Sequence, residues 1–246
     1  RQMKKFYIIG IDDNGQREFQ AEVREIITTH RVFSGGKRHY ELMRDRLPEQ
    51  YVWIDITVPL EEVFEKYAAY CEVVVFASGD PLFFGFANTV KSRLPEAEIQ
   101  VFPWFNSLQM LAHRLVIPYQ DMEVVSLTGR PWHEFDRALI AGKEKIGVLT
   151  DRQHTPVAIA GRMLEYGYAG YRMHIGEMLG NVTERVRTME LPEVLRSDFA
   201  FPNCLMSGSQ KIVINAGGDV WCFARIQLFK NCIANRETLF VFGISH

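Results

Sequence analysis

The sequence is short of cysteine, of net charge and of long apolar runs, and each shortage excludes a class of protein. The four cysteines among 246 residues form no C-x-x-C pair, so a thiol-based metal or redox motif is missing and a reduced, cytoplasmic protein is expected. The formal charge of -2, from 28 basic and 30 acidic side chains, provides no global field for nucleic acid or an anionic membrane. No apolar run approaches the roughly 18 residues that a membrane-spanning helix needs, so we expect no membrane segment.

Motifs of several enzyme classes are also missing. The seven histidines show neither H-x-x-x-H nor Cys/His ligand spacing, so no metal site is expected. Neither the G-x-S-x-G elbow of hydrolases nor the G-x-x-x-x-G-K phosphate loop occurs. The loop from Gly10 to Gly15 is not G-x-G-x-x-G. Its Asp12 and Asp13 would repel a pyrophosphate, which disfavours an NAD site.

What the sequence does contain is a regular alternation of short β-rich runs with longer helical patterns. Val73 to Ala77 lacks the polar–apolar alternation of a half-exposed strand, which predicts a strand buried on both faces in a parallel sheet. The pattern closes near Pro118 and then restarts. Strands are expected at 5–9, 31–33, 51–56, 73–77, 99–102, 123–127, 145–150 and 171–175, and helices at 17–29, 37–46, 60–70, 84–94, 107–115, 134–141 and 155–166.

This order predicts an α/β protein built from two α/β domains. We expect an N-terminal domain over 1–117, a C-terminal domain over 118–206 and a tail of uncertain assignment over 207–246. In the tail, Ser207 to Ser209 suggests a flexible joint, and 211–215 and 239–244 suggest further strands. A small-molecule site is expected in the cleft between the domains.

The segment VVVFASGDPLFFG, residues 73–85, passes from a buried strand directly into turn chemistry. Gly79 lets the backbone turn with little steric cost, Asp80 is expected to cap the next helix, and Pro81 suits the first turn of that helix. Ligands of open parallel sheets bind beyond the carboxyl ends of strands, where this turn lies. Such a turn is also ordinary loop chemistry.

Two further strand ends carry polar residues. In VFPWFNSLQMLAHRL, Asn106 or Ser107 is expected to cap the following helix. In KIGVLTDRQHTP, Arg152 and His154 are expected to project into the cleft. A polar cap and a charged loop are common in any fold, so neither segment identifies a site alone.

Taken together, these segments resemble the tetrapyrrole methylases, which are S-adenosylmethionine-dependent methyltransferases of class III with two α/β domains and the active site in the cleft between them. The likeness covers about Phe6 to Met206. Within the family, SLTGR, LTDRQHTP and GEMLGNVTER are most similar to members that methylate carbon 5 of precorrin-7 or cobalt-precorrin-7 in cobalamin biosynthesis. The matching segments, in order, are VVVFASGDPLFFG, FPWFNSLQMLAHRLVIP, VVSLTGR, IGVLTDRQHTPVAIAGRMLEYGY, HIGEMLGNVTER and FPNCLM.

The resemblance implies S-adenosyl-L-methionine as cofactor and S-adenosylhomocysteine as product. It places the backbone of Ser78, Gly79 and Asp80 against the amino-acid end of the cofactor. Met189 is an additional candidate contact. The expected cofactor-binding residues are Gly10, Ser78, Gly79, Asp80, Phe83, Asn106, Ser107 and Thr150.

Two features depart from the family pattern. The family usually opens with a G-x-G-P-G loop followed by Leu-Thr, whereas this chain has GIDDNGQREF, and Trp104 stands where the family generally has glycine.

The carboxylates of a tetrapyrrole substrate require cations, and arginine binds carboxylate through its planar fork. The expected substrate-binding residues are Lys37, Arg38, Arg130 and Arg152.

No catalytic residue is predicted, because a sulfonium methyl is already activated and the enzyme must mainly position the acceptor, an effect of roughly 7 to 11 kcal/mol. Glu177, Asp151 and His154 are the nearest candidates for a base, and none is selected. The tail lacks the glycine-rich loop of the carbon-15 methyltransferase and decarboxylase found in fused relatives, so that activity is expected in a separate subunit. A homodimer is expected from the resemblance, and neither nucleic acid nor membrane is an expected partner.

Two other readings stay open. One keeps the fold and changes the acceptor to another corrin position, a sirohaem precursor or the histidine-derived residue of diphthamide synthesis. The other makes the chain a non-catalytic module that binds cofactor or tetrapyrrole. Binding of S-adenosylhomocysteine separates a transferase from such a module.

Overall fold

The computed structural model describes residues 3–209, which fall into two compact units. Among the described residues, unit 1 comprises 3–117 together with the later segment Gly176–Arg185, and unit 2 comprises Pro118–Ile175 and 186–209. A segment that lies late in the sequence is therefore part of the first unit. The two units are described one at a time.

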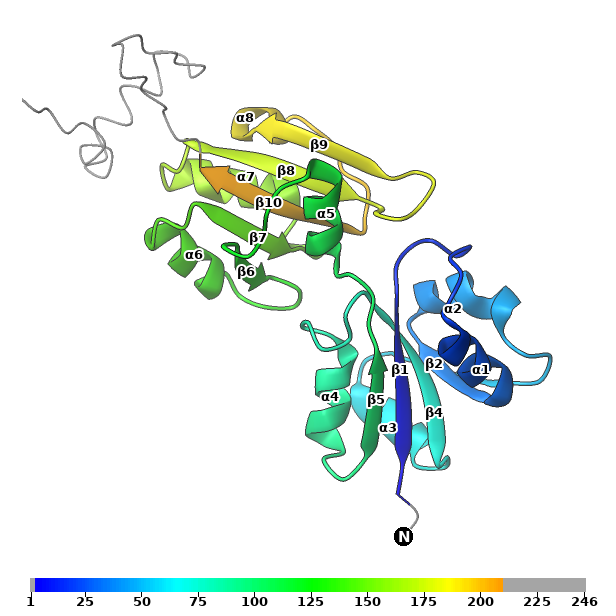
Figure 1. Ribbon diagram of the computed structural model, residues 1–246. Coiled ribbons are helices and arrows are strands. Elements are labelled where there is room, and N and C mark those ends of the chain that lie inside the picture. The colour runs from blue at the N-terminus through cyan, green and yellow to red at the C-terminus, as the bar shows by residue number, and fades with distance from the viewer. Residues whose placement is uncertain (1–2, 210–246) are drawn as a thin grey trace, which may run out of the picture. The chain divides into compact units, whose positions relative to one another are not determined.

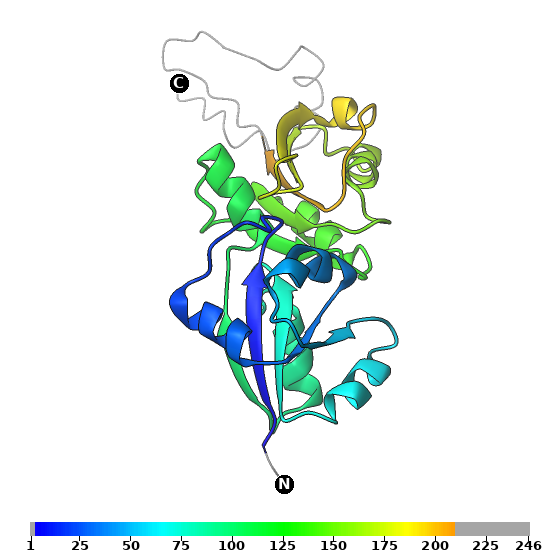
Figure 2. The same ribbon diagram turned by 90° about the vertical axis from the view of Figure 1, so that its right-hand side faces the viewer.

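Unit 1 is built on a five-stranded sheet in the order β3-β2-β4-β1-β5 (Figure 1). Every adjacent pair is parallel, and Figure 2 shows β1 and β4 side by side with their arrowheads at the same end. Parallel strands bring their carboxyl ends to one edge of the sheet. The strands are β1 (Lys5–Ile11), β2 (Val32–Gly35), β3 (Val52–Asp55), β4 (Glu72–Ser78) and β5 (Glu98–Phe102).

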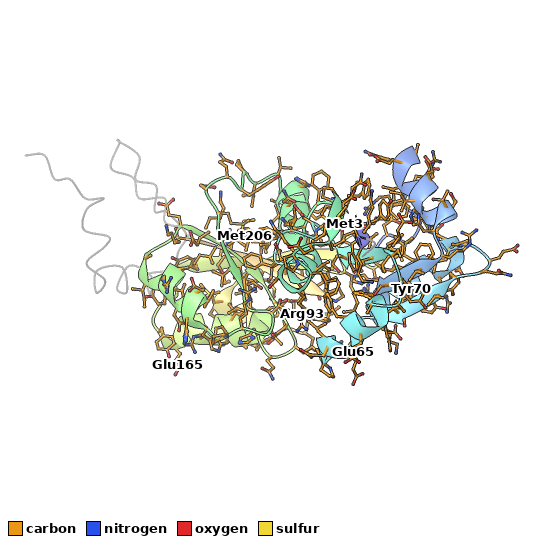
Figure 3. All side chains as sticks on the ribbon, turned by 90° about the horizontal axis from the view of Figure 1, so that it is seen from below. Met3, Glu65, Tyr70, Arg93, Glu165 and Met206 are labelled. Atoms are coloured by element: carbon orange, nitrogen blue, oxygen red, sulfur yellow. The ribbon has the colours of Figure 1, made fainter. Side chains whose placement is uncertain are left out.

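Helices cover both faces of this sheet. Alternate residues of β4 belong to different cores: Val73 and Val75 pack with α3 and α4, whereas Val74 and Phe76 pack with α1 and α2. The expectation of a strand buried on both faces is thus confirmed. Arg93 of α4, labelled in Figure 3, lies over the ring of Phe64 in α3, which shares its face. The helices on the sheet are α1 (Ala21–Thr29), α2 (Lys37–Met43) with the 3-10 turn η1 (Arg44–Arg46), α3 (Leu60–Tyr67) and α4 (Phe86–Arg93). The helix α5 (Ser107–Leu115) also belongs to unit 1.

Unit 2 has a mixed sheet in the order β6-β7-β10-β8-β9. β6 and β7 are parallel, whereas β10 runs antiparallel to β7. The core of this unit joins the sheet to three helices. Met206 on β10, labelled in Figure 3, is buried. The elements are β6 (Glu123–Ser126), α6 (His133–Ile140), β7 (Lys145–Leu149), α7 (Pro156–Glu165), β8 (Tyr171–Glu177), β9 (Arg185–Glu190), α8 (Leu191–Val194) and β10 (Asn203–Ser209).

The flexible joint expected at Ser207 to Ser209 is wrong, because these residues form the end of β10. Ser207 pairs with Ile146 and Gly208 with Lys145, and Ser207 is fully buried. Short polar residues suggest a linker only when no strand lies alongside to accept their backbone hydrogen bonds. The strands expected at 211–215 and 239–244 lie outside the described residues.

The sequence patterns also missed β9 and α8. β9 has the sequence RVRTME with no fully buried residue, so it shows little of the hydrophobic signal on which strand prediction depends. Among residues 3–209, none of the helices is long and apolar enough to cross a membrane.

Candidate functional site

The carboxyl ends of β1, β4 and β5 meet at Gly79 in unit 1. The N–H of Gly79 donates to the carbonyl of Ile11 at 2.7 Å, and the N–H of Trp104 donates to the carbonyl of Gly79 at 3.1 Å. Gly79 therefore ties three strand ends together with its own peptide groups. Because these two peptide groups are already bonded within the protein, Gly79 can contribute to a ligand site only through the shape of its backbone.

The same junction explains two glycines. A Cβ on Gly10 would lie 1.9 Å from the carbonyl oxygen of Gly79. Gly79 itself has a φ of +61°, and a Cβ there would lie 2.8 Å from the Cα of Asn106. Both positions require glycine because the chain's own backbone fills the space, before any ligand is considered.

The turn after β4 differs from its prediction in one respect. Asp80 does not cap α4: its Oδ1 accepts from the N–H of Leu82 at 2.9 Å and closes a turn. Pro81 also lies in this turn, and α4 begins only at Phe86, with Gly85 as its N-cap. Phe84, with a φ of +51°, interrupts any continuous helix from Pro81, because the left-handed region cannot extend a right-handed helix.

Exposed polar and aromatic groups surround this tight junction. Ser78 is exposed and Asp80 is half-buried. Phe83 is half-buried and packs edge-on against Phe84, with ring centroids 5.1 Å apart. These side chains lie on one loop at the carboxyl edge of the sheet, where ligands of this fold class bind.

Asn106, one of the two residues expected to cap this helix, is the N-cap of α5. Its Oδ1 accepts from the N–H of Gln109 at 2.8 Å, while its own N–H donates to Oε1 of Gln109 at 2.9 Å. Ser107 is the first residue of the helix. This capping box fixes the path of the chain from β5 past Gly79 into α5.

The first loop replaces glycines with charge pairs. Asp12 pairs with Arg17, and Oδ1 of Asp13 accepts from Nε of Arg38 at 2.7 Å. The guanidinium of Arg17 also lies 3.5 Å from the ring centroid of Trp104, a close cation–π contact. The negative charges expected to repel a pyrophosphate are therefore each paired within unit 1, and the case against an NAD site depends on the missing glycines instead.

The two cations expected after the Gly35-Gly36 turn occupy different environments. Lys37 is exposed. Arg38 is held between Asp13 and the sulfur of Met178, which its Nη2 approaches to 3.9 Å. Arg38 thus already neutralises one carboxylate of its own unit, whereas Lys37 faces solvent.

His39 is a functional candidate that the sequence analysis missed. Its Nδ1 accepts from the N–H of Gly36 at 3.0 Å, and its Nε2 lies 2.9 Å from Oγ of Ser78. Burial lowers the pKa of His39 to about 4, against a raising effect of Asp13, so the ring is neutral at pH 7. The sequence signal for His39 is the run GGKRH. A Cβ on Gly35 would lie 3.0 Å from the Cβ of His39, so glycine at this position leaves room for the His39 side chain.

In unit 2, the residues after β7 are bound into their own loop. The hydroxyl of Thr150 donates to Asn203 at 2.6 Å. Oδ1 of Asp151 accepts from the N–H of His154 at 2.6 Å and its Oδ2 from the N–H of Gly129 at 2.8 Å. Burial acts to raise the pKa of Asp151, but these backbone groups outweigh it and lower the pKa to about 2.

His154 does not project into a cleft as expected. It is buried, its Nδ1 lies 3.0 Å from Oδ1 of Asp151, and its ring packs edge-on against Trp132 at a centroid distance of 4.7 Å. An aromatic neighbour and a carboxylate within the same unit hold the imidazole inward. His154 is buried and Asp151 is half-buried, and each is hydrogen-bonded within unit 2.

The remaining sequence candidates in unit 2 lie at its surface. Arg130 and Arg152 are both exposed, and the guanidinium of Arg152 lies 4.6 Å from the ring centroid of Phe201. Met189 packs against the core of this unit and lines a surface hollow together with Arg187 and Arg196. Arginines with accessible guanidinium groups can bind carboxylates.

Glu177 is a buried carboxylate with a dedicated partner. It is 1% exposed, and Nε and Nη2 of Arg185 donate to its two oxygens at 2.7 and 2.9 Å. A bidentate pair of this kind joins the two ends of the segment from Gly176 to Arg185. Within residues 3–209, no three His, Cys, Asp or Glu side chains come together as metal ligands.

The fold is that of the class III methyltransferases. A uroporphyrin-III C-methyl transferase from Thermus thermophilus, solved in complex with S-adenyl homocysteine, has the same fold with a TM-score of 0.63 and 20% sequence identity, covering 83% of this chain and 92% of that one. At this level of identity the likeness concerns the fold.

The chain belongs to the family of tetrapyrrole (corrin/porphyrin) methylases, whose pattern matches residues 5–195. It is 33% identical over 184 residues to a decarboxylating precorrin-6Y C(5,15)-methyltransferase from Sinorhizobium sp., covering 74% of this chain and 44% of that protein. It is 26% identical over 188 residues to a cobalt-precorrin-7 C(5)-methyltransferase from Salmonella typhimurium, covering 76% of this chain and 91% of that protein. The chain thus spans less than half of the first relative and nearly all of the second.

Methyltransferases of this family use S-adenosylmethionine, and the chemistry of the site in unit 1 fits such a group. The exposed hydroxyl of Ser78 and the carboxyl of Asp80 suit a carboxylate and an ammonium, respectively. Phe83 offers an apolar face beside them. Gly10 and Gly79 let the backbone segments at these strand ends pack closely together, which positions the loop that carries these groups.

Proposed function

We propose that this chain transfers the methyl group of S-adenosylmethionine to carbon 5 of precorrin-7 or cobalt-precorrin-7 in cobalamin biosynthesis. The observation that carries this proposal is its similarity to the Salmonella typhimurium C(5)-methyltransferase over 91% of that protein's length. The Sinorhizobium relative, which acts at two positions, is matched over only 44% of its length. The sequence of residues 207–246 contains no glycine-rich cofactor loop of the carbon-15 enzyme, so the proposal gives methylation at carbon 15 and decarboxylation to a separate subunit.

The proposed cofactor contacts come mainly from unit 1. Ser78, Gly79 and Asp80 bind the amino-acid end, and the other contacts follow from the neighbouring strand ends. Gly10 and Gly79 contribute by letting the strand ends pack closely together. The full set comprises Gly10, Ser78, Gly79, Asp80, Phe83, Asn106, Ser107 and, from unit 2, Thr150.

The proposed substrate contacts are cations. Lys37, Arg130 and Arg152 are exposed and suit the carboxylates of a tetrapyrrole. Arg38 is shared with Asp13, so its contribution to substrate binding is expected to be smaller than that of Lys37.

When bound, the cofactor supplies an activated methyl group on a sulfonium. The residues of this chain then have to hold the donor and orient the acceptor carbon toward it, which is the role of positioning in catalysis. The candidate bases are committed elsewhere: Glu177 to Arg185 and Asp151 to backbone N–H groups. This arrangement supports a mechanism without a protein base in the methyl-transfer step.

The test uses the purified full chain with labelled S-adenosylmethionine and either precorrin-7 or its cobalt form. Transfer of label to the macrocycle, located at carbon 5 by NMR, is the expected result. Calorimetry with S-adenosylhomocysteine runs in parallel. Binding without transfer to either acceptor would contradict the assigned acceptor, and no binding would contradict the transferase itself.

A different acceptor is the second candidate, since the Thermus thermophilus structure of the same fold is named for uroporphyrin-III. Uroporphyrinogen III in the same label-transfer assay distinguishes the two. A homodimer belongs to the proposal as well, and sedimentation analysis of the purified chain tests it. A monomer that still transfers methyl would remove the dimer from the proposal without affecting the activity.

A further inference from the structure

The contact between His39 and Ser78 joins two elements that are far apart in the sequence. His39 lies in the first turn of α2, and Ser78 ends β4. Along β4, Val74 and Phe76 face the helix layer of α1 and α2. Ser78 shares this orientation because alternate residues of a strand point the same way. The imidazole therefore reaches the strand end from the adjacent helix layer.

The hydrogen bonds determine the tautomer of His39. The N–H of Gly36 can only donate, so Nδ1 of His39 is the acceptor and carries no proton. In a neutral imidazole the proton is then on Nε2, and Nε2–H donates to Oγ of Ser78 at 2.9 Å. The lowered pKa of His39 agrees with a neutral ring.

This arrangement fixes how the Ser78 hydroxyl is used. Because Oγ accepts from His39, its rotamer is held and its own proton is directed to another acceptor. Ser78 is exposed at the carboxyl end of β4, where a ligand can provide that acceptor. A carboxylate is the strongest acceptor available on an amino acid.

We propose that His39 is a positioning residue for the cofactor: it holds Ser78 as a hydrogen-bond donor to the carboxylate at the amino-acid end of S-adenosylmethionine. The inference rests on the proposed function, because it takes the ligand from there. His39 acts through Ser78 and touches neither the methyl group nor the acceptor.

Two substitutions separate the two hydrogen bonds of the imidazole. In His39→Asn, the amide oxygen can replace Nδ1 as acceptor for Gly36, but the side chain is too short to reach Ser78. In His39→Gln, the longer amide can place a donor near the Nε2 position. A purely structural role in capping Gly36 predicts that the asparagine variant resembles the wild type, whereas the positioning role favours the glutamine variant.

The experiment measures binding of two ligands to the full chain by calorimetry. S-adenosylhomocysteine carries the amino-acid end, and 5′-methylthioadenosine lacks it. We expect His39→Asn to weaken S-adenosylhomocysteine binding about tenfold, the usual worth of a hydrogen bond to a charged group. His39→Gln should retain most of the affinity, and neither variant should change binding of 5′-methylthioadenosine.

The His39→Asn substitution is also made in a Ser78→Ala variant, which lacks the hydroxyl that His39 contacts. If His39 acts through Ser78, His39→Asn adds no further loss to Ser78→Ala. Equal affinity of the wild type and His39→Asn for S-adenosylhomocysteine, or a parallel loss for both ligands, would overturn the positioning role. Failure of the wild type to bind S-adenosylhomocysteine would instead overturn the proposed function, so the two failures are distinguishable.

Discussion

In each unit a buried strand, β4 or β7, ends in a run of polar residues, yet the polar groups of the two runs are used differently. After β4, the backbone of Gly79 holds the strand ends together, and the hydroxyl of Ser78 stays exposed. After β7, the side chains of Thr150 and Asp151 hold the loop together instead. His154 is buried against them.

The difference teaches that a polar run after a buried strand is not itself a binding site. The deciding factor is whether backbone groups or side chains make the hydrogen bonds that hold the turn. Where peptide groups join the strand ends, as at Gly79, the hydroxyl of the neighbouring Ser78 remains exposed. Where carboxyl and hydroxyl groups close it, as at Asp151, they are already consumed.

The largest expected effect on stability comes from replacing one of two glycines with positive φ, which lie in different units. Gly79 and Gly129 have φ values of +61° and +62°, but only Gly79 is crowded, whereas a Cβ on Gly129 would meet no atom within 4 Å. Gly79→Ala should lower the free energy of unfolding by more than about 3 kcal/mol through strain and clash together. Gly129→Ala should cost about 1 to 2 kcal/mol from the backbone alone. Urea unfolding of both variants measures this, and equal losses would contradict a crowded junction at Gly79.

Arg130 tests whether the exposed arginines of unit 2 serve the substrate separately from the cofactor. Arg130→Ala should raise the KM for the tetrapyrrole about tenfold, the effect of losing a charge-assisted hydrogen bond, and leave S-adenosylhomocysteine affinity unchanged. Arg137→Ala is the control, since Arg137 is 74% exposed and pairs with Glu134 on α6. Equal loss of both ligands in Arg130→Ala would point to misfolding and remove Arg130 from the substrate site.

The loop after β7 should show a distinct pH dependence of stability. The folded-state pKa of Asp151, about 2, is depressed below the unfolded value of about 3.9. Its stabilisation is therefore fully present above pH 4 and lost as the pH falls toward 2. Asp151→Asn should cost about 1 kcal/mol at pH 7, and the difference from the wild type should shrink over that acidic window.

Denaturant unfolding between pH 7 and pH 2 follows this difference. Asp45→Asn serves as the control, because the Asp45 side chain is 92% exposed and its Oδ1 lies as far as 3.9 Å from Nε of Arg44. Its variant should track the wild type at every pH. A constant deficit for Asp151→Asn down to pH 2 would show that the carboxylate charge is not what stabilises the loop.

Local patterns were enough for much of the fold. The helix at 107–115 is found at those bounds with Asn106 as its cap, and β4 is buried on both faces. These features depend on the periodicity and end chemistry of one segment. Patterns failed where the deciding partner is distant, as at Ser207, which pairs with Ile146, and at His154, which packs on Trp132. They also failed at the turn after Asp80, where a local hydrogen bond to Leu82 competes with a helix cap.

The sequence by itself determined the alternation of strands and helices, the family resemblance and the strand ends at which polar residues gather, because these are local or ordered along the chain. Only the tertiary structure decided which of those residues are available. Gly79 must be glycine because Asn106 lies against it. His39 meets Ser78 across 39 residues, and Asp151 meets Gly129 across 22. Contacts of this kind join separate elements, and no spacing rule within a single segment specifies them.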